Sequence, residues 1–252
     1  MSHNTGILPT HNFQDGTFEA YRGIDSEAMK ESRSGKKACG SCALGCGNFT
    51  KTGRGVVEGP EYETLGALGS KCYIKDLNAI AMGNYICNRM GLDTISTGQV
   101  IATAMEWYEK GLIDDKTTEG IQLAFGNAKS MVEMVNNIAI RKGYGDVLAE
   151  GSYRAAEKIG KNAHDYVFQV KGMELASCGV RASKGEALSH LISARGADHL
   201  RPYASVIDAF GYLEPELGIN EKVSPFEDSN KKWVKPFMEL SMLTNLLGVC
   251  LF

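Results

Sequence analysis

The chain has 252 residues, of which 43% are hydrophobic and 23% are charged, and its formal net charge is −3. This composition is ordinary for a globular protein with a substantial core, and the length suits one large domain or one domain with part of a second. The lack of excess positive charge argues against nucleic acid as a partner. The opening residues MSHNTGILPT contain no apolar stretch like that of a signal peptide, and no apolar run is long enough to cross a bilayer. We therefore expect a cytoplasmic protein without a membrane partner.

Most of the predicted elements are helices. Residues 1–38 are expected to be irregular with one short helix, and the segment that follows, as far as Pro60, is rich in glycine. From about Leu77 the pattern becomes helical, most clearly at Val100–Tyr108, and Gly111 stands where a helix C-cap belongs. Further helices are predicted after Thr117–Glu119 to near Gly143, from Asp146 to Gly160, from Lys184 to Ala194 and from Phe237 to Leu247, with a short strand at Tyr166–Val170. The sequence therefore predicts a mainly α fold with few short strands.

Two features bear on how the chain is organised. The composition shifts near Val170–Gly172, which we take as a domain boundary, giving domains over residues 1–169 and 170–252. Residues Leu246–Phe252 are almost entirely apolar. Because a buried segment rarely ends in a charged carboxylate, we expect the chain to be one piece of a longer protein and its second domain to be incomplete.

Three of the seven cysteines, Cys39, Cys42 and Cys46, crowd into one short segment with the spacing C-x2-C-x3-C. A secreted disulfide framework would spread its cysteines through the chain, whereas clustered thiols in a reducing compartment are typical of metal ligands. Thiolates at this spacing can bind different irons of one cubane, and the glycines between them let the backbone wrap closely. A structural zinc site and a set of free thiols are the alternatives. An iron–sulfur cluster and a zinc ion would each need a fourth ligand from elsewhere in the chain.

The remaining cysteines and most of the histidines carry no such signal. Cys72, Cys87 and Cys178 lack ligand spacing and are expected to be buried thiols. The sequence offers no convincing partner for His3, His11, His164 or His190.

A series of motifs in a fixed order resembles the aldehyde:ferredoxin oxidoreductase family of tungsten–pterin enzymes along essentially the whole chain. No single motif would suffice, but together and in register they are specific. They are Gly6–Phe13, the cysteine segment, Glu58–Thr64 (EGPEYET), Gly91–Ser96 (GLDTIS), Gly145–Gly151 (GDVLAEG), Arg195–Leu200 (RGADHL) and Leu247–Phe252 (LGVCLF).

The resemblance implies that this chain corresponds to only a part of a longer, multidomain architecture. Members of the family have an N-terminal β-rich domain that cradles two pterins, followed by two mostly helical domains. Residues 1–169 resemble the first helical domain and residues 170–252 the opening part of the second. An N-terminal pterin-cradling domain or subunit would therefore be a partner of this chain.

The resemblance also implies ligands for both cofactors. The family holds one [4Fe–4S] cluster through the three clustered cysteines and a distant fourth, which matches Cys250 in NLLGVC. Two related Asp-x-x-Gly-Leu-x segments bind the pterins of a tungsten bis-pterin centre, and they match Asn88–Asp93 and Asn245–Cys250. The implied pterin contacts are Asn88, Gly91, Leu92, Asp93, Asn245, Gly248 and Val249. Both segments here begin with Asn in place of Asp, and an amide oxygen can accept the same hydrogen bonds without the charge.

The implied catalytic residues are Glu63 and His199. Each stands where the family places an active-site residue of that type, and a carboxylate and an imidazole can relay the protons that aldehyde oxidation releases. Taken singly, Glu63 reads as a helix-start or solvated residue and His199 as a surface histidine. Other positions depart from the family pattern, among them Met82, where the family has an acidic residue, and Cys178–Arg181, where it often has Asp-Pro-Arg.

The resemblance thus predicts part of an oxidoreductase that converts an aldehyde to a carboxylate and passes electrons through the cluster to ferredoxin. The alternatives are a benzoyl-CoA reductase-type member of the family, an electron-transfer iron–sulfur module without its own active centre, and a zinc-stabilised structural domain. The choice between tungsten and molybdenum, the substrate and a possible homo-oligomer stay open at this point.

Overall fold

The computed structural model describes residues 2–227 and 231–251. The chain begins with an irregular segment and a 3₁₀ turn, η1 (Tyr21–Gly23), before helix α1 (Ser26–Ser32), where the Asp25 carboxylate caps the N-terminus by accepting from the amides of Glu27 and Ala28. Strands β1 (Arg33–Lys37), β2 (Gly47–Thr52) and β3 (Gly55–Glu58) follow as an antiparallel sheet in that order. The sequence predicted irregular structure here, because these short strands are polar and glycine-containing and show no apolar alternation.

The next elements run through the centre of the molecule. Helix α2 (Tyr62–Thr64) continues into a π-helical turn, η2 (Leu65–Ser70), and is followed by α3 (Leu77–Met90) and α4 (Thr94–Glu109). Asp76 and Asp93 cap α3 and α4 through their carboxylates. Gly91, at the end of α3, has a φ of +72°, a conformation that glycine adopts without strain. The predicted helical pattern after Leu77 is confirmed as two helices.

Two predicted helices are shorter than the sequence suggested. The segment after Thr117–Glu119 is irregular as far as α5 (Ala128–Ala139), because Gly126 (φ +83°) interrupts it and Asn127 provides the cap. The helix predicted over residues 146–160 is divided into α6 (Tyr144–Leu148) and α7 (Ser152–Ile159) by Gly151, whose φ is +88°. The prediction was therefore wrong in continuity, although it placed helical structure in the right regions.

The last third of the described chain starts with a small hairpin. After η3 (Ala163–Tyr166), strand β4 (Gln169–Val170) pairs with β5 (Met173–Glu174), so the predicted strand at Tyr166–Val170 is confirmed only at its end. A turn, η4 (Val180–Ala182), leads to α8 (Lys184–Ile192), α9 (Ser205–Asp208), η5 (Pro215–Leu217) and α10 (Val234–Leu246). The structure confirms the expectation of a mainly α fold with few short strands.

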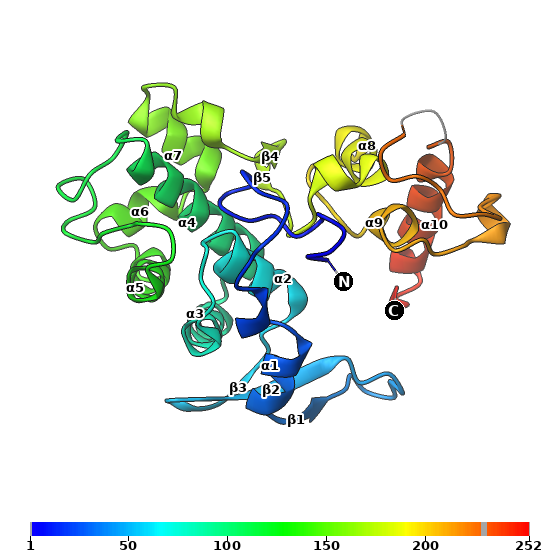
Figure 1. Ribbon diagram of the computed structural model, residues 1–252, viewed down its shortest axis with the longest axis horizontal. Helices are drawn as coiled ribbons and strands as arrows, with labels where there is room; N and C mark the ends of the chain where they lie inside the picture. The colour runs from blue at the N-terminus through cyan, green and yellow to red at the C-terminus, as the bar shows by residue number, and fades with distance from the viewer. Residues whose placement is uncertain (1, 228–230, 252) are drawn as a thin grey trace.

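Buried apolar residues form one large core and several small ones. The large core spans residues 8–167 and includes Trp107, Leu68 and Met131, none of them accessible to solvent. A smaller core, with Trp233 and Val234, lies among residues 204–237. In Figure 1, α3 to α7 gather on one side, α8 to α10 on the other, and the β1–β2–β3 sheet forms the lower edge.

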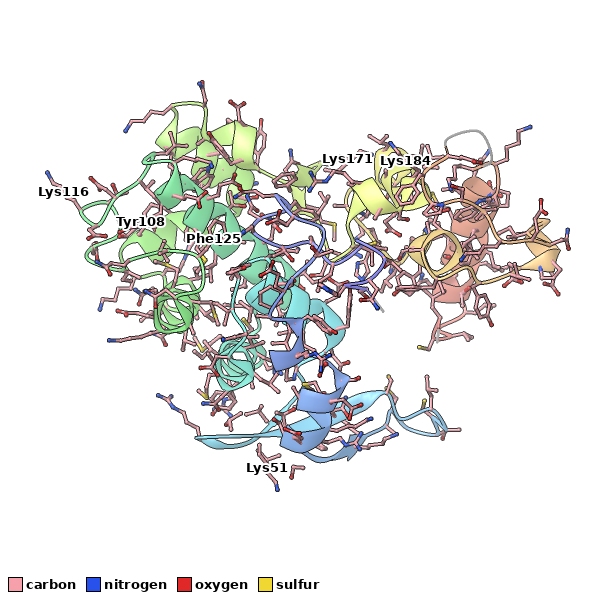
Figure 2. All side chains as sticks on the ribbon, viewed as in Figure 1. Lys51, Tyr108, Lys116, Phe125, Lys171 and Lys184 are labelled. Atoms are coloured by element: carbon pink, nitrogen blue, oxygen red, sulfur yellow. The ribbon has the colours of Figure 1, made fainter. Side chains whose placement is uncertain are left out.

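The two sides are joined near the β4–β5 hairpin. Lys171, at its turn, donates from Nζ to the Ser193 carbonyl oxygen at 2.8 Å and so ties the hairpin to the end of α8 (Figure 2). The boundary at residues 169 and 170 stays a prediction, and it would fall inside β4. In the part of the chain that the structure describes, no helix is both long and apolar enough to cross a membrane.

Candidate functional site

Glu63 and His199, which are far apart in the sequence, face each other in the structure. Glu63 Oε1 lies 3.6 Å from His199 Nε2, and both side chains are mostly buried, at 18% and 14% exposure. The other carboxylate oxygen, Oε2, accepts a hydrogen bond of 2.6 Å from the Ser177 amide. Because one oxygen is fixed by a backbone donor, the second is held toward the imidazole.

The contact between α2 and the Ser177 segment depends on a glycine. A Cβ at Gly66 would lie 2.3 Å from Ser177 Cβ and 2.4 Å from its Oγ, which is far inside normal contact distance. Two further hydrogen bonds cross the same contact: Tyr62 donates to the Ser177 carbonyl oxygen at 3.0 Å, and Ser177 Oγ donates to the Glu63 carbonyl oxygen at 3.3 Å. The absence of a side chain at Gly66 therefore lets the two segments approach closely enough to fix Glu63.

The loop that carries His199 is held by Asp198. This carboxylate is 3% exposed; it accepts from the Leu200 amide at 3.1 Å and from Arg195 Nη1 at 3.0 Å, and it pairs with the Arg201 guanidinium. Burial acts to raise the pKa of Asp198, but these hydrogen bonds and the Arg201 charge outweigh it and lower the pKa. An ionised Asp198 thus holds the Leu200 amide, directly after His199, and the side chains of Arg195 and Arg201.

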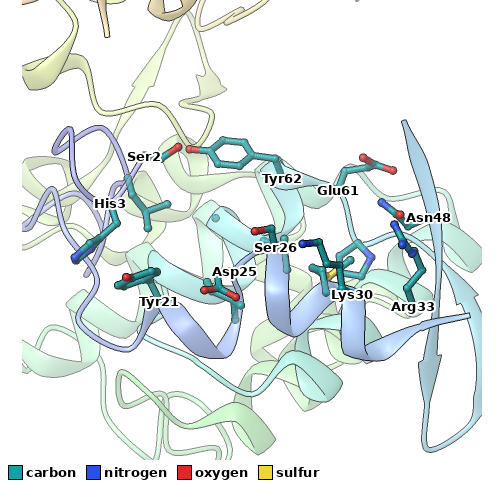
Figure 3. Close-up of a pocket in the computed structure, with 16 residues that line it drawn as sticks. Ser2, His3, Tyr21, Asp25, Ser26, Lys30, Arg33, Asn48, Glu61 and Tyr62 are labelled. Atoms are coloured by element: carbon teal, nitrogen blue, oxygen red, sulfur yellow. The ribbon is translucent and has the colours of Figure 1, made fainter. Parts of the chain in front are cut away.

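A cavity of about 610 Å³ lies on the other side of α2, between the N-terminal segment, α1 and β2. Figure 3 shows the Tyr62 hydroxyl beside Ser2, with Lys30, Arg33, Asn48 and Glu61 grouped at the opposite end. Neither Glu63 nor His199 lines this cavity, so it shares α2 with the Glu63–His199 pair without opening onto it.

The cysteines that the sequence analysis singled out are all exposed. Cys39, Cys42 and Cys46 lie in the connection between β1 and β2, and Cys250 follows α10. Among the described residues, no three His, Cys, Asp or Glu side chains are gathered closely enough to hold a metal ion. In Figure 1 the β1–β2 connection extends to the side of the molecule where α10 ends.

The chemistry of these thiols nevertheless fits an iron–sulfur cluster. Hydrogen bonds from the backbone at Gly45 and then Leu44 lower the pKa of the Cys42 thiol, which favours the thiolate that binds metal. Gly45 has a φ of +55°, so the loop turns through a conformation that glycine permits. Amide groups directed at a sulfur are a usual feature of cluster loops. Cys72, Cys87 and Cys178 are buried, as predicted.

The predicted pterin-contacting residues fall into two groups, one bonded to the segment before Glu63 and the other to the loop that carries His199. Asn88 lies near the end of α3 and donates to the Glu58 carbonyl oxygen at 3.3 Å, in the segment that leads to Glu63. Asn245 lies near the end of α10 and accepts from Arg201 Nη2 at 3.3 Å, in the loop that carries His199. Gly91, Leu92 and Asp93 form the short link between α3 and α4, while Gly248 and Val249 follow α10 and are exposed.

Three buried ionisable groups that were not predicted from the sequence lie beside this site. Lys71 is inaccessible to solvent, donates to the Leu175 carbonyl oxygen at 2.7 Å and lies 5.0 Å from the centre of the Phe13 ring. Burial lowers the pKa of Lys71 to about 8, although the charge of Glu63 acts in the opposite direction. Glu186 and His190 on α8 form a buried pair with 3.8 Å between Oε1 and Nε2. His190 therefore has a buried carboxyl beside it, although neither of its ring nitrogens makes a hydrogen bond within the described residues, and the four-residue spacing on a predicted helix was the available signal for the approach.

Comparison with known proteins gives a consistent result. A family profile described as "Aldehyde ferredoxin oxidoreductase, domains 2 & 3" matches residues 1–252. The tungsten-containing aldehyde ferredoxin oxidoreductase of Thermococcus kodakarensis is 39% identical over 253 residues, which cover 98% of this chain and 40% of the relative. An aliphatic sulfonate oxidoreductase, WOR-like subunit, of Pyrococcus furiosus is 31% identical over 180 residues, or 69% of this chain and 27% of the relative.

A solved structure supports the fold. The active site complex BamBC of benzoyl coenzyme A reductase, in complex with 1,5 dienoyl-CoA, superposes with a TM-score of 0.66 at 22% identity, covering 94% of this chain and 36% of the other. The chain spans about 40% of the length of the tungsten-containing relative. The family resemblance read from the sequence is confirmed: this chain belongs to the aldehyde ferredoxin oxidoreductase family and matches the part of it described as domains 2 and 3.

Proposed function

We propose that this chain forms the helical side of a tungsten–pterin oxidoreductase that oxidises an aldehyde to a carboxylate and passes the electrons to ferredoxin. Membership of the family over the whole chain supports the enzyme class. The observation that carries the catalytic part is the 3.6 Å approach of Glu63 and His199, which brings a carboxylate and an imidazole together at a site that neither segment forms alone.

The residues that would hold the cofactors follow from the positions described above. Cys39, Cys42, Cys46 and Cys250 would hold one [4Fe–4S] cluster, and the two asparagine segments would contact the pterins of a tungsten centre. When bound, the centre would supply the two-electron chemistry and the cluster would supply one-electron transfer. A preceding pterin-cradling domain or subunit would provide the remaining contacts.

Glu63 and His199 would manage protons. Oxidation of an aldehyde by water releases protons near the reacting carbon, and a general base must lie within hydrogen-bonding reach of them. Glu63 has one oxygen free of the Ser177 amide, and this oxygen faces His199 Nε2. A proton taken by the carboxylate can therefore pass to the imidazole, and the anchored Asp198 loop keeps the imidazole in place.

The test uses the complete protein purified without oxygen. We expect tungsten, pterin and about four irons per chain, together with aldehyde-dependent reduction of a dye. Glu63→Gln should lower turnover by about 10²- to 10⁴-fold while metal content stays at the wild-type value, because Gln keeps the shape but cannot accept the proton. Glu174→Gln is the matched control, since that carboxylate is also buried but binds Ser152 away from the pair. Zinc in place of iron, or full turnover by Glu63→Gln, would contradict the proposal.

A further inference from the structure

Lys71 carries a buried positive charge that the proposed mechanism does not use. Its side chain is inaccessible to solvent, and within the described chain Nζ makes one hydrogen bond, of 2.7 Å to the Leu175 carbonyl oxygen. The ammonium also lies 5.0 Å from the centre of the Phe13 ring. Because burial lowers the pKa of Lys71 only to about 8, the amine is still mostly protonated at neutral pH. A buried charge with so few partners is costly, so its position requires an explanation.

The carbonyl that Lys71 holds is next to the amide that holds Glu63. The Leu175 carbonyl and the Ser177 amide belong to adjacent peptide planes, and only the two backbone dihedral angles of Ala176 separate them. Ala176 is 1% exposed, so its packing restricts these angles. The Ser177 amide donates to Glu63 Oε2 at 2.6 Å. Fixing the Leu175 carbonyl therefore also limits the orientation of the Ser177 amide.

The same π-helical turn brings Lys71 and Gly66 to this stretch of backbone. Gly66, which lies in η2, makes the close approach to Ser177 described above. The Lys71 amide, directly after η2, donates to the Gly66 carbonyl oxygen at 3.0 Å. This bond spans five residues, which is the π-helical pattern, and such turns are frequent at functional sites. One turn therefore supplies both the glycine that lets the Ser177 segment approach and the ammonium that bonds to it.

We infer that Lys71 is a positioning residue for Glu63 and acts through the backbone of residues 175–177. The ammonium fixes the first carbonyl of this stretch, and the Ser177 amide is thereby held at Glu63 Oε2. The other carboxylate oxygen, Oε1, is left to face His199 Nε2 at 3.6 Å. The importance of Lys71 for turnover rests on the proposed role of Glu63 as proton acceptor, whereas the positioning itself does not.

The first experiment follows the Ser177 amide and needs no activity. In the complete protein at neutral pH, hydrogen–deuterium exchange of this amide should be about 5- to 30-fold faster in Lys71→Met than in wild type, because methionine keeps a long flexible side chain but donates no hydrogen bond. Lys171→Met is the matched control, since Lys171 also donates to a backbone carbonyl oxygen, that of Ser193, and should leave the Ser177 amide unchanged. Wild-type exchange in Lys71→Met, or an equal rise in Lys171→Met, would overturn the positioning.

A second variant tests the same link with the lysine in place. Phe13→Leu removes the ring beside the ammonium, so exchange of the Ser177 amide should rise, although by less than in Lys71→Met. If Lys71→Met does not fold, Phe13→Leu decides the question, and wild-type exchange in this variant would overturn the inference.

The last experiment asks whether Lys71 acts through Glu63. In the active complete enzyme, Lys71→Met should lower kcat by less than the roughly 10²-fold minimum expected for a direct acid–base group and leave KM unchanged. Combined with Glu63→Gln, it should cause no further loss, because the carboxylate that Lys71 positions is already gone. Losses that multiply in the double variant would overturn this route of action. If the wild-type enzyme oxidises no aldehyde, the proposed function fails, whereas exchange of the Ser177 amide still decides the positioning.

Discussion

Replacing Gly66 with alanine should destabilise the protein and disturb the site at the same time. The new Cβ would lie 2.3 Å from Ser177 Cβ, so either η2, which carries Gly66, or the Ser177 segment must move. Overpacking of this kind costs about 1–3 kcal/mol. Alanine recovers about 0.5–1 kcal/mol of backbone entropy in a helix, which leaves a net loss of at most about 2.5 kcal/mol, and of about 1 kcal/mol at the middle of the two ranges. Movement of Ser177 would also lengthen the 2.6 Å hydrogen bond from its amide to Glu63.

The assay is thermal or denaturant unfolding of the complete protein, combined with turnover. A loss of about 1 kcal/mol lowers the midpoint by about 2–4 °C in a domain of this size. Gly53→Ala is the matched control, because a Cβ at Gly53 would meet no other atom within 4 Å and should change nothing. The decisive variant is Gly66→Ala with Ser177→Gly, which removes the atoms that clash. The double variant should be more stable than the sum of the single effects predicts. If Gly66→Ala matches wild type, or if Ser177→Gly brings no recovery, the close contact is not what fixes Glu63.

Three other predictions concern the cluster, a buried lysine and the isolated chain. Cys250→Ser should lower iron and sulfide content, whereas Cys87→Ala should leave both unchanged; the reverse pattern in iron analysis would contradict the ligand assignment. The pKa of Lys71 falls from 10.5 to about 8 on folding. Between pH 8 and pH 10.5 the unfolded state therefore keeps a proton on the Lys71 amine that the folded state has lost. The free energy of unfolding of wild type should therefore rise by about 2–3 kcal/mol relative to that of Lys71→Met as the pH rises from 8 to 10.5. Denaturant titration at several pH values measures this, and parallel curves of stability against pH would count against it. The 252-residue chain alone should bind no tungsten. It should also aggregate, because Leu246 (81% exposed) and Leu247 (70% exposed) belong to an uncovered apolar surface. A chain that is monodisperse in light scattering and contains tungsten in metal analysis would refute this.

Local patterns predicted the helices well where caps and periodicity agreed. The apolar spacing around Val100 and the glycine at position 111 marked α4, and the structure has a helix over Thr94–Glu109. The start of α5 was misplaced because Ile121 and Phe125 fit the helical period, yet Gly126 and the Asn127 cap exclude a helix before residue 128. The three-stranded sheet was invisible because its strands are stabilised by backbone pairing, which leaves no periodic trace in polar residues.

In the candidate site, too, some residues could be predicted from the sequence and others could not. The family motifs identified Glu63 and His199, and the structure brings these two residues together. Ser177 could not be found in this way, since it acts through its backbone amide, which every non-proline residue has. Lys71 gave no signal because its burial depends on the N-terminal segment and on Leu175, both distant in the sequence.

The position of the Glu63–His199 pair has a consequence for synthesis of the protein. Chains fold from the N-terminus as they emerge, and the large core is complete once residue 167 has been made. At that moment Glu63 has neither the Ser177 amide nor the imidazole beside it, because both belong to later residues. The ribosome must therefore add a further stretch of chain, and that stretch must dock, before the carboxylate acquires its partners. The nascent protein can thus be well folded and still lack the geometry of its site.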